Sequence, residues 1–310
     1  MIEILKPSEG KFETIDKFSP NSWVNVACPA EHELETLKKD FPVPDDFLHS
    51  LRDVDELPSW DEHEKCTCII IKIPYNKKGN ALEYSTVPLG ILVTKENVIT
   101  ICYFENEVTA HLKSQAFAFT KTHLVFRLMF LATKLYLDYL NEIKKKMYDI
   151  ESKLETTLQN KLVMKLLELE KDLVYFDTGL RANDILLHRF AHEQSKNKFI
   201  KIKTPEDTRL IENAIDENKQ AIQMANIYSM ILSNTLDAFT SIISNNLNIV
   251  IKVLTVITVM IALPTLVASI YGMNINLPFQ HSPSAFSLLM FISVLLAALF
   301  VLVLWKKRYL

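Results

Sequence analysis

Near the end of the chain, hydroxyl and amide side chains recur every three or four residues within an otherwise apolar run. Such intervals place residues on one face of an α-helix. This face, called the polar stripe below, consists of Asn248, Ile251, Thr255, Thr258, Ala262, Thr265, Ser269 and Gly272. Neutral oxygens on one face of an apolar helix could line a water-filled path through a membrane. Alternatively, the Thr and Ser hydroxyls could bond to backbone carbonyls and help helices to pack closely in lipid.

Two apolar residues and a proline also affect what this face of the helix could do. Ile251 and Leu254 lie at its first turn, where a ring of apolar side chains could close a path by excluding water. Pro264 lacks a backbone N–H, so it removes the hydrogen bond to residue 260 and predicts a kink or a local loosening of the helix. A path lined by the polar stripe would therefore have an apolar constriction at one end.

Two uncharged apolar runs must position the polar stripe. Residues 253–270 and 285–304 contain no Asp, Glu, Lys or Arg, and about 20 apolar residues suffice for a helix to cross a bilayer. Residues 271–284 are also uncharged, whereas Lys252 precedes the first run and Lys306, Lys307 and Arg308 follow the second. This distribution of positive charge predicts that both termini lie in the cytoplasm. We expect membrane helices at 249–271 and 285–305, an extracellular loop at 272–284 and a basic cytosolic tail at 306–310.

The sequence Tyr271-Gly272-Met273-Asn274 spans the end of the first predicted membrane helix and the start of the predicted loop. This motif, the two spans at the end of the chain and the large N-terminal part together resemble the CorA family of divalent-cation channels. The resemblance implies a homopentamer in the lipid bilayer of the cell membrane that conducts Mg²⁺, with Co²⁺ or Ni²⁺ as further ions. It also implies that Gly272, Met273 and Asn274 form the selectivity filter. Neutral oxygens there would suit Mg²⁺, which keeps several of its waters when bound.

Two alternatives stay open beside this interpretation. A zinc-type transporter of the same fold would share the architecture, although Gly-Met-Asn is its less usual signature. A membrane-anchored coiled-coil scaffold would use the polar stripe only to pack helices and would not conduct ions. Family loops often carry an acidic residue after Gly-Met-Asn, whereas residues 275–284 have none and contain His281. The sequence therefore does not predict that charge at the mouth captures cations.

A long stalk helix is predicted to lead into the first span. Thr204 is a good N-cap, Pro205 suits a first helical turn, and neither Gly nor Pro recurs before Pro264. The stalk, residues 204–248, carries an apolar seam toward the membrane. A helix from Pro205 to Gly272 would be on the order of 100 Å long at 1.5 Å per residue. Because such a rod is not stable alone, it favours self-assembly.

The rest of the chain predicts an α+β domain. Alternating or β-branched runs predict strands at 23–28, 66–73, 85–93 and 98–104, with short helices at 31–39 and 45–53 between them. Apolar seams predict an amphipathic helical pair within residues 121–203. We expect a cytosolic α/β domain at 1–120 with αβα layers, packed with this pair. The stalk and the two membrane helices follow, and five copies would form a funnel.

Acidic residues in two segments are candidates for a regulatory Mg²⁺ site. The resemblance implies that cytosolic Mg²⁺ binds between the N-terminal domain of one subunit and the stalk of its neighbour. The candidates are Glu212, Asp216 and Asp237 in the stalk and Asp45, Asp46 and Asp53 in the N-terminal domain. A bound ion would keep the stalks symmetric and the channel shut. A solvated acidic face is the alternative.

Charge and motifs speak against several other classes of function. The formal net charge is −3, and the four charged residues from Asn245 onward are all basic, so the first 244 residues carry −7. Nucleic-acid binding is therefore not predicted. The sequence contains no Gly-x-Ser-x-Gly nucleophile motif and no Walker phosphate loop, so we expect no enzyme activity.

Two groups of His and Cys are weaker candidates for metal sites. His63, Cys66 and Cys68 supply three ligands without a second pair, and both cysteines fall on one face of a predicted strand. His188 and His192 are one helical turn apart but lack the Glu of a zincin motif. We interpret the first group as part of a strand and the second as a plain helix face.

Overall fold

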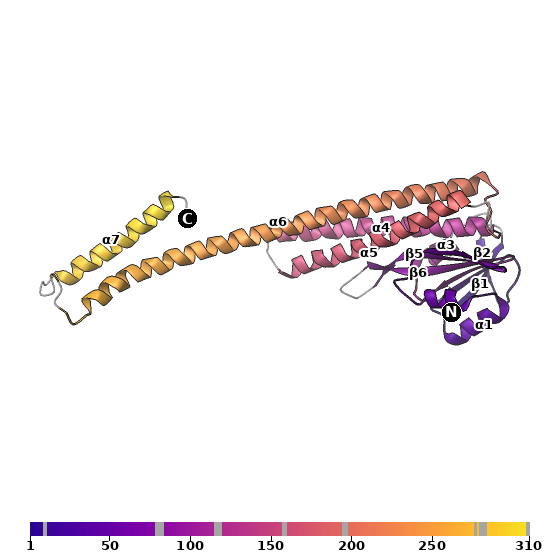
Figure 1. Cartoon of the computed structure of the whole chain (residues 1–310), viewed down its shortest axis with the longest axis horizontal. Helices are drawn as coiled ribbons and strands as arrows, with labels where there is room; N and C mark the ends of the chain where they lie inside the picture. Colours follow the sequence, from indigo (N-terminus) through magenta and orange to yellow (C-terminus); the bar gives the residue numbers. More distant parts are fainter. Residues whose placement is uncertain are drawn as a thin grey trace. The chain divides into compact units, whose positions relative to one another are not determined.

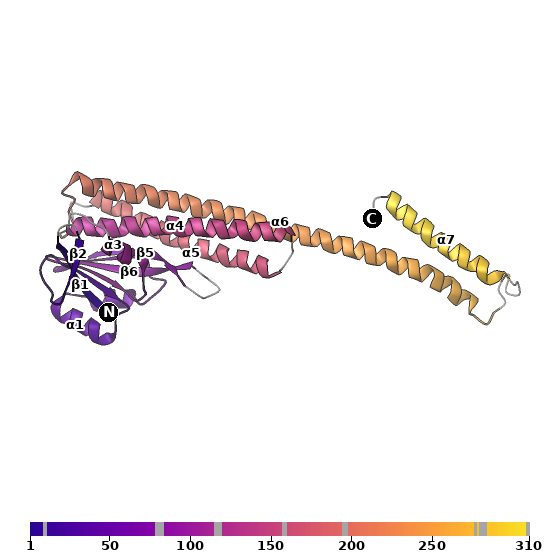
Figure 2. The ribbon, with the colours of Figure 1, turned by 180° about the vertical axis from the view of Figure 1, so that it is seen from behind.

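The computed structural model describes residues 1–8, 11–77, 84–114, 120–156, 160–193, 198–275, 278 and 284–307. The chain forms two compact units, Met1–Asn234 and Thr235–Leu310, and each is described by itself. The first unit contains a sheet and the helices around it. The second contains the end of the longest helix and the last helix (Figure 1 and Figure 2).

Seven strands in the described part of the first unit form one mixed sheet. They are β1 (Ile2–Ser8), β2 (Lys11–Ile15), β3 (Trp23–Ala27), β4 (Ser59–Glu62), β5 (Cys66–Asn76), β6 (Tyr84–Thr94) and β7 (Val98–Cys102). Their order is β2-β1-β3-β7-β6-β5-β4. Only β3 and β7 run parallel among the neighbouring pairs. The four predicted strands correspond to β3, β5, β6 and β7, while β1, β2 and β4 lie toward the two edges and were not predicted.

Helices cover both faces of this sheet. On one face, α1 (Glu31–Asp40) and α2 (Asp45–Ser50) pack on β3, β5, β6 and β7 through a buried cluster that includes Leu37, Leu51 and Ile70. A side chain at Gly90 of β6 would collide with Leu51 and Phe47, so the close packing there depends on glycine. On the other face, α4 (Lys121–Thr156) and α5 (Asn160–Glu193) pack on β5 and β6, and α3 (Glu107–Lys113) packs on α4. The αβα layers agree with the predicted fold class.

One buried side chain of α5 completes the hydrogen bonding of the sheet. The pairing of β4 with β5 reaches only to Ile70, two residues before Lys72. There the amide of Asn183 accepts a hydrogen bond from the N–H of Lys72 at 2.9 Å and donates one to its carbonyl at 2.7 Å. Buried backbone groups are costly when unpaired. Asn183 therefore takes the place of a strand and ties α5 to β5.

The longest helix, α6, spans Pro205–Tyr271 and belongs to both units. Its start agrees with the prediction, because Oγ1 of Thr204 accepts a hydrogen bond from the N–H of Asp207 at 3.2 Å. The helix continues through Pro264. Within the first unit, α6 packs against both long helices. Glu217 forms an ion pair with Lys134 of α4, and the side-chain amide of Asn218 donates a hydrogen bond to the carbonyl of Leu180 in α5 at 3.0 Å.

In the second unit, α7 (Ala285–Lys306) lies alongside the end of α6 (Figure 1 and Figure 2). Val256 of α6 and Ser293 of α7 are buried, and Val259, Leu263 and Val267 of α6 are partly buried. These positions mark the face of α6 that α7 covers. By length and composition, α6 and α7 could each cross a membrane. The two predicted spans therefore fall within helices.

Candidate functional site

The polar stripe lies on an exposed face of the second unit. Each of its residues, from Asn248 to Gly272, is exposed. At about 100° per residue, the centre of the stripe lies roughly 125° around α6 from the face that α7 covers. Packing of α6 on α7 therefore does not use the stripe.

The threonine hydroxyls of the stripe donate to carbonyls of their own helix. Oγ1 of Thr255 donates to Ile251 at 2.8 Å, that of Thr258 to Leu254 at 2.8 Å, and that of Thr265 to Ile261 at 2.7 Å. Because a hydroxyl has one hydrogen to donate, what each oxygen then offers to its surroundings is lone pairs. Waters bound to a cation point their hydrogens outward, so these oxygens can accept hydrogen bonds from a hydrated cation.

The Gly-Met-Asn motif ends α6. The N–H of Gly272 donates to the carbonyl of Ala268 at 2.9 Å, and the next N–H donates to Ile270 at 3.3 Å. The hydroxyl of Tyr271 donates to the carbonyl of Pro278 at 3.2 Å and so ties the following loop to the helix end. Asn274 is exposed, and its neutral amide oxygen follows the stripe directly. His281 lies outside the described residues.

The two apolar candidates for a constriction are uncovered in a single chain. Ile251 exposes 51% of its surface and Leu254 exposes 61%. Exposed branched side chains are unfavourable in water, so both need cover from lipid or from another copy of the chain. They could close a path only in such an assembly.

The acidic candidates do not converge within the described residues of one chain. Asp45 and Asp46 lie in the first turn of α2, and a hydrogen bond from the Lys38 ammonium lowers the pKa of the Asp45 carboxyl. Oδ1 of Asp53 accepts a hydrogen bond from the N–H of Asp55 at 2.9 Å. The stalk candidates are exposed on α6: Glu212, Asp216 and Asp237. Over the described residues, no three His, Cys, Asp or Glu side chains are grouped to hold a metal ion.

The Cys66 and Cys68 pair belongs to the core. Both side chains are buried under α1 and α2, and the thiol of Cys66 donates to the carbonyl of Pro42 at 3.2 Å. Burial raises the pKa of both thiols. A metal ligand must be a thiolate, so this environment opposes metal binding, in line with the interpretation as a strand.

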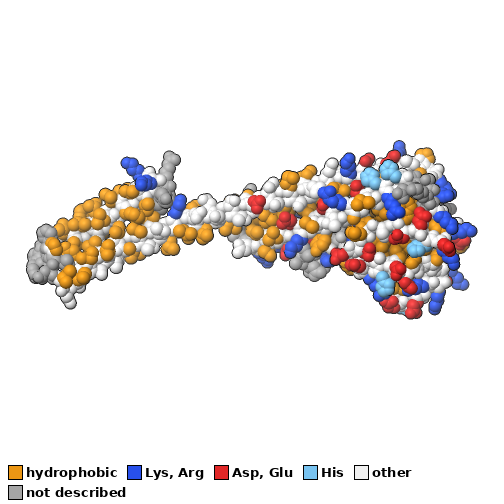
Figure 3. All heavy atoms as spheres, in the orientation of Figure 1, with side chains coloured by type: hydrophobic (Ala, Val, Ile, Leu, Met, Phe, Trp, Pro, Cys, Tyr) orange, Lys and Arg blue, Asp and Glu red, His pale blue; other side chains and the backbone are white. Residues whose placement is uncertain are grey.

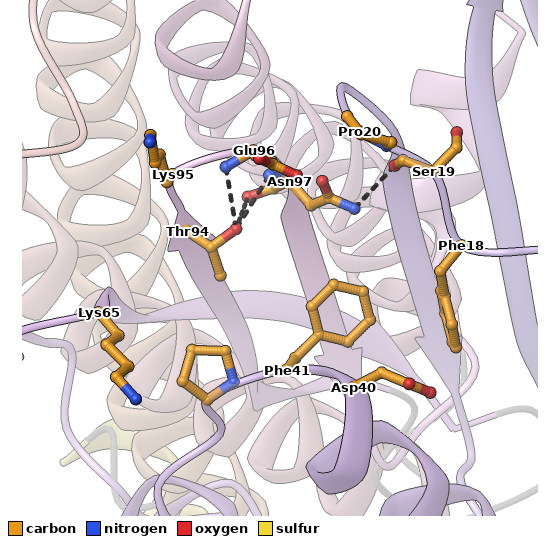
Figure 4. Close-up of a pocket in the computed structure, with 11 residues that line it drawn as sticks. Phe18, Ser19, Pro20, Asp40, Phe41, Lys65, Thr94, Lys95, Glu96 and Asn97 are labelled. Atoms are coloured by element: carbon orange, nitrogen blue, oxygen red, sulfur yellow. Dashed lines mark hydrogen bonds between the residues drawn. The ribbon is translucent and has the colours of Figure 1, made fainter.

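A pocket of about 360 Å³ lies at one end of the sheet, and none of the residues that line it belongs to α6. The rings of Phe18 and Phe41 meet edge to face with centroids 4.9 Å apart. The charged ends of Lys65, Lys95 and Asp40 lie apart around the pocket (Figure 4). Because these charges are of both signs and do not converge, the pocket supports no binding site.

A sequence profile for a family described as "CorA-like Mg2+ transporter protein" matches residues 19–308. The chain belongs to the CorA family. The match runs from before β3 of the α/β domain to the end of α7, and it confirms the resemblance carried by Tyr271-Gly272-Met273-Asn274. CorA-family proteins are integral to the membrane, in agreement with the two apolar helices.

Relatives with known sequences or structures support the same family. The "Cobalt/magnesium transport protein CorA" of Methanocaldococcus jannaschii is 28% identical over 289 residues, which cover 90% of this chain and 88% of the relative. The complete structure of the CorA magnesium transporter from the same organism has a TM-score of 0.83 and 25% identity, covering 98% of this chain and 96% of that one. The CorA fold of an α/β domain, a long helix and an apolar C-terminal helix is thereby confirmed.

More distant structures share the fold alone. The full-length CmaX protein has a TM-score of 0.71 at 13% identity and covers 94% of both chains. The cytoplasmic domain of ZntB from Vibrio parahaemolyticus has a TM-score of 0.59 at 12% identity, covering 79% of this chain and 96% of that one. At this identity the likeness says nothing about which ion a protein of this fold carries.

Sequence reasoning missed two features of the candidate pathway. It placed the stripe on one face but did not say which face α7 covers, because α7 is apolar on all sides. It also missed the contact between Tyr271 and Pro278, although the presence of Tyr directly before Gly272 was a signal.

Proposed function

We propose that this CorA-family chain forms a homopentameric channel that carries hydrated Mg²⁺ into the cell, with Co²⁺ and Ni²⁺ as further ions. The observation that carries the proposal is the exposed, uncharged stripe of hydrogen-bond acceptors on α6, which leads to Gly272, Met273 and Asn274. The name of the Methanocaldococcus jannaschii relative supports both magnesium and cobalt as ions. The activity is transport rather than catalysis.

A pathway of neutral oxygens suits the chemistry of Mg²⁺. Mg²⁺ gives up its waters reluctantly, so a selective path is better served by groups that bond to those waters than by carboxylates that replace them. In our proposal the carbonyls of Gly272 and the side chain of Asn274 form this filter, and Met273 packs the loop. The acceptors of Thr255, Thr258 and Thr265 then support the hydrated ion along the path.

Assembly about an axis normal to the membrane would enclose the stripe. α6 exposes the stripe on a face that α7 leaves open, and a helix of 67 residues needs neighbours along its length. Five copies of α6 would surround the path, with α7 toward the lipid. Both termini lie in the cytoplasm in this arrangement, because the basic residues flank the spans on that side.

The membrane potential supplies the driving force. Each elementary charge gains about 2.3 kcal/mol per 100 mV, so a divalent cation gains roughly 4.6 kcal/mol on entering a cell with a negative interior. Uptake therefore needs no nucleotide hydrolysis.

Cytosolic Mg²⁺ regulates the channel in this proposal. Ile251 and Leu254 close the path, and Mg²⁺ bound between subunits at the acidic candidates holds the closed state. A single chain does not group these carboxylates, so the site requires a second copy. If Asp216→Ala and Asp237→Ala leave the dependence of the current on internal Mg²⁺ unchanged, the regulatory residues are others.

The test is Mg²⁺ influx into proteoliposomes with an inside-negative potential. Asn274→Ala should reduce influx at least tenfold, roughly the effect of losing two hydrogen bonds to the ion's waters. Asn246→Ala is the matched control, because Asn246 is an exposed asparagine on a different face of α6. Both variants must remain assembled by size-exclusion chromatography.

The same assay separates the alternatives. Zn²⁺ influx that exceeds Mg²⁺ influx would favour a zinc-type transporter of this fold. If the natural chain carries neither ion while the potential is maintained, the channel proposal is wrong and a membrane-anchored scaffold is favoured.

A further inference from the structure

Within the first unit, the middle of α6 buries small and polar side chains. Asn218 is fully buried, and Ala214, Ala221 and Ala225 are buried on the same face, one or two turns away. These four residues are called the α6 seam below. The buried apolar side chains that are described on α5 are larger: Leu166, Leu169, Leu173, Phe176, Leu180, Leu186, Leu187 and Phe190. Because alanine removes little apolar surface from water, the α6 seam stabilises the packing of α6 less than leucine or phenylalanine would.

The amide of Asn218 joins the α6 seam to α5 through its nitrogen only. Nδ2 donates to the carbonyl of Leu180 at 3.0 Å and to Oδ1 of Asp184 at 3.2 Å. The Oδ1 atom of Asn218 is buried and accepts no hydrogen bond from the described residues. A buried acceptor that has lost its bonds to water and gained none costs free energy. The amide therefore specifies where α6 lies on α5 and at the same time weakens the packing there.

Asn183 of α5 is a buried amide of the opposite kind. Its oxygen accepts from the N–H of Lys72 and its nitrogen donates to the carbonyl of the same residue, so replacing it would remove both bonds from a buried strand. The partners of Asn218 do not depend on it in this way. The carbonyl of Leu180 lies inside a helix, and the side chain of Asp184 is 31% exposed and within reach of water. An apolar residue could therefore replace Asn218 without leaving its partners unsatisfied.

The ends of this buried face of α6 are held more firmly than the α6 seam. At the start of the helix, Nδ1 of His123 in α4 lies 3.3 Å from Oδ1 of the buried Asp207. Leu210 is buried before the seam, and Tyr228 and Leu232 are buried after it. Larger buried side chains thus lie on both sides of a weaker stretch.

The other polar contacts beside the α6 seam lie at the surface. Nη2 of Arg181 in α5 donates to Oδ1 of Asn226 at 3.1 Å, and both residues are exposed. The ion pair between Glu217 and Lys134 of α4 is partly exposed. Such contacts contribute little to stability because water competes for them. They therefore do not compensate for the small side chains of the seam.

We propose that the α6 seam is a joint, at which α6 transiently leaves α5 while α4 and α5 stay packed on the sheet. Asn218 sets a single register each time the joint closes, as one buried polar residue does in helical assemblies. Its unpaired oxygen keeps the closed joint weak. A role for the joint in opening the channel rests on the proposed function, in which the stalk must rearrange between the closed and open states.

Thiol labelling of the full chain in detergent measures this opening. Ala221→Cys places a reporter in the α6 seam, and Ala132→Cys places one on the buried face of α4, beside Ile71 of β5. Cys28→Ser removes the exposed native thiol, and this chain without a reporter gives the background of the three buried cysteines. A maleimide reacts only when a thiol becomes exposed, so its rate follows the open fraction. The reporter at 221 should react at least about tenfold faster than the reporter at 132, whose exposure requires opening of the core.

Substitution of Asn218 tests the cause of the weakness. Asn218→Leu keeps the branching of the side chain and removes the unpaired acceptor, so the reporter at 221 should react about tenfold more slowly and the reporter at 132 at an unchanged rate. Asn218→Val is the second variant, because leucine is larger than asparagine and could overpack the seam. Asn183→Leu is the matched control. It should lower the unfolding temperature by roughly 4 °C or more, whereas at least one variant of Asn218 should not lower it.

Equal reaction rates at the two reporters would overturn the joint. So would labelling at 221 that is unchanged or faster in both variants of Asn218. The labelling involves no ion flux, so it decides on the joint whether or not the proposed channel is right. Mg²⁺ influx by the Asn218 variant that slows labelling tests the role in opening and should fall about threefold or more. Unchanged influx together with slower labelling would mean that the joint takes no part in opening.

Discussion

The two units place the same kinds of side chain in opposite surroundings. In the first unit Trp23, Leu37 and Phe176 are fully buried, whereas in the second Phe286 exposes 77% of its surface and Leu254 exposes 61%. Charged side chains gather on the first unit, and hydrophobic ones cover the second (Figure 3). The first unit thus has its own core in water, while the second has the surface of a structure that lipid or further copies of the chain must cover.

This contrast changes the meaning of a polar residue. Thr133 on α4 is buried and donates to the carbonyl of Met129 at 3.1 Å, and Thr258 makes the same bond on an exposed face. In the first case the bond satisfies a hydroxyl inside a core. In the second it leaves the oxygen's lone pairs exposed, and in our proposal they face the ion path. Spacing along the helix does not distinguish these two roles, and only exposure does.

The largest expected effect concerns the core of the first unit. Trp23→Ala should lower the free energy of unfolding by about 3–5 kcal/mol, because it leaves a cavity and removes the bond from Nε1 to Oγ1 of Thr100. Urea unfolding of the full chain in detergent, followed by near-ultraviolet circular dichroism, measures it. Phe286→Ala in α7 should change stability by no more than about 0.5 kcal/mol. An equal loss from both variants would mean that the second unit has a core of its own.

The next prediction compares the exposed Thr258 with the buried Thr133. Thr258→Val keeps the shape of the side chain but removes an acceptor from the proposed path, so Mg²⁺ influx should fall about tenfold in proteoliposomes. Thr133→Val should leave influx unchanged, since its hydroxyl faces only its own helix. A similar decrease in both would show that the lost back-bond, and not the acceptor, matters.

A smaller effect is expected at the proposed apolar constriction. Leu254→Ser should raise Mg²⁺ leak at high internal Mg²⁺ by about threefold or more, because a polar ring no longer excludes water. Val253→Ser is the control: Val253 is also exposed but lies on another face of α6. A leak that stays low in Leu254→Ser would place the constriction elsewhere.

The smallest effect is a pH dependence confined to the charged unit. A hydrogen bond from the Lys113 ammonium lowers the pKa of Glu3 below its ordinary value of 4.5. The resulting stabilisation is complete above pH 4.5 and is lost as the pH falls through the lower pKa of the folded state. The natural chain should therefore lose about 0.5 kcal/mol more than Glu3→Gln on acidification, because the pair is partly exposed.

Unfolding titrations at neutral and acidic pH measure this difference. High salt should reduce it, since salt screens partly exposed pairs. A difference that is insensitive to salt would point to a cause other than the pair of Glu3 and Lys113.

The sequence predicted those parts of the fold that local patterns determine. Thr204 and the absence of Gly and Pro predicted where α6 begins and how far it extends, and uncharged length predicted the apolar helices. It missed β4, whose Ser59-Trp60-Asp61-Glu62 sequence is half charged, because only pairing with β5 makes this segment a strand. The hydrogen bonds between Asn183 and the backbone of Lys72 were not predicted either, because they join segments that are far apart in the chain.

For the candidate site, local patterns predicted the position of residues on α6 and not their role. Helical spacing predicted that the residues from Asn248 to Ser269 share one face of α6, while the filter at Gly272, Met273 and Asn274 stays a prediction from the family resemblance. The acidic candidates stay a prediction, because the described residues of one chain do not group them.

The make-up of the polar stripe has a consequence for how the proposed path would behave when the cell acidifies. Its side chains carry amides, hydroxyls or hydrocarbon only, and none of these gains or loses a proton under conditions in which proteins stay folded. A preference for cations that rests on fixed lone pairs cannot be titrated away, unlike one that rests on a ring of carboxylates. Chloride and other anions would meet the same unfavourable lone pairs in an acidified cell as in a neutral one.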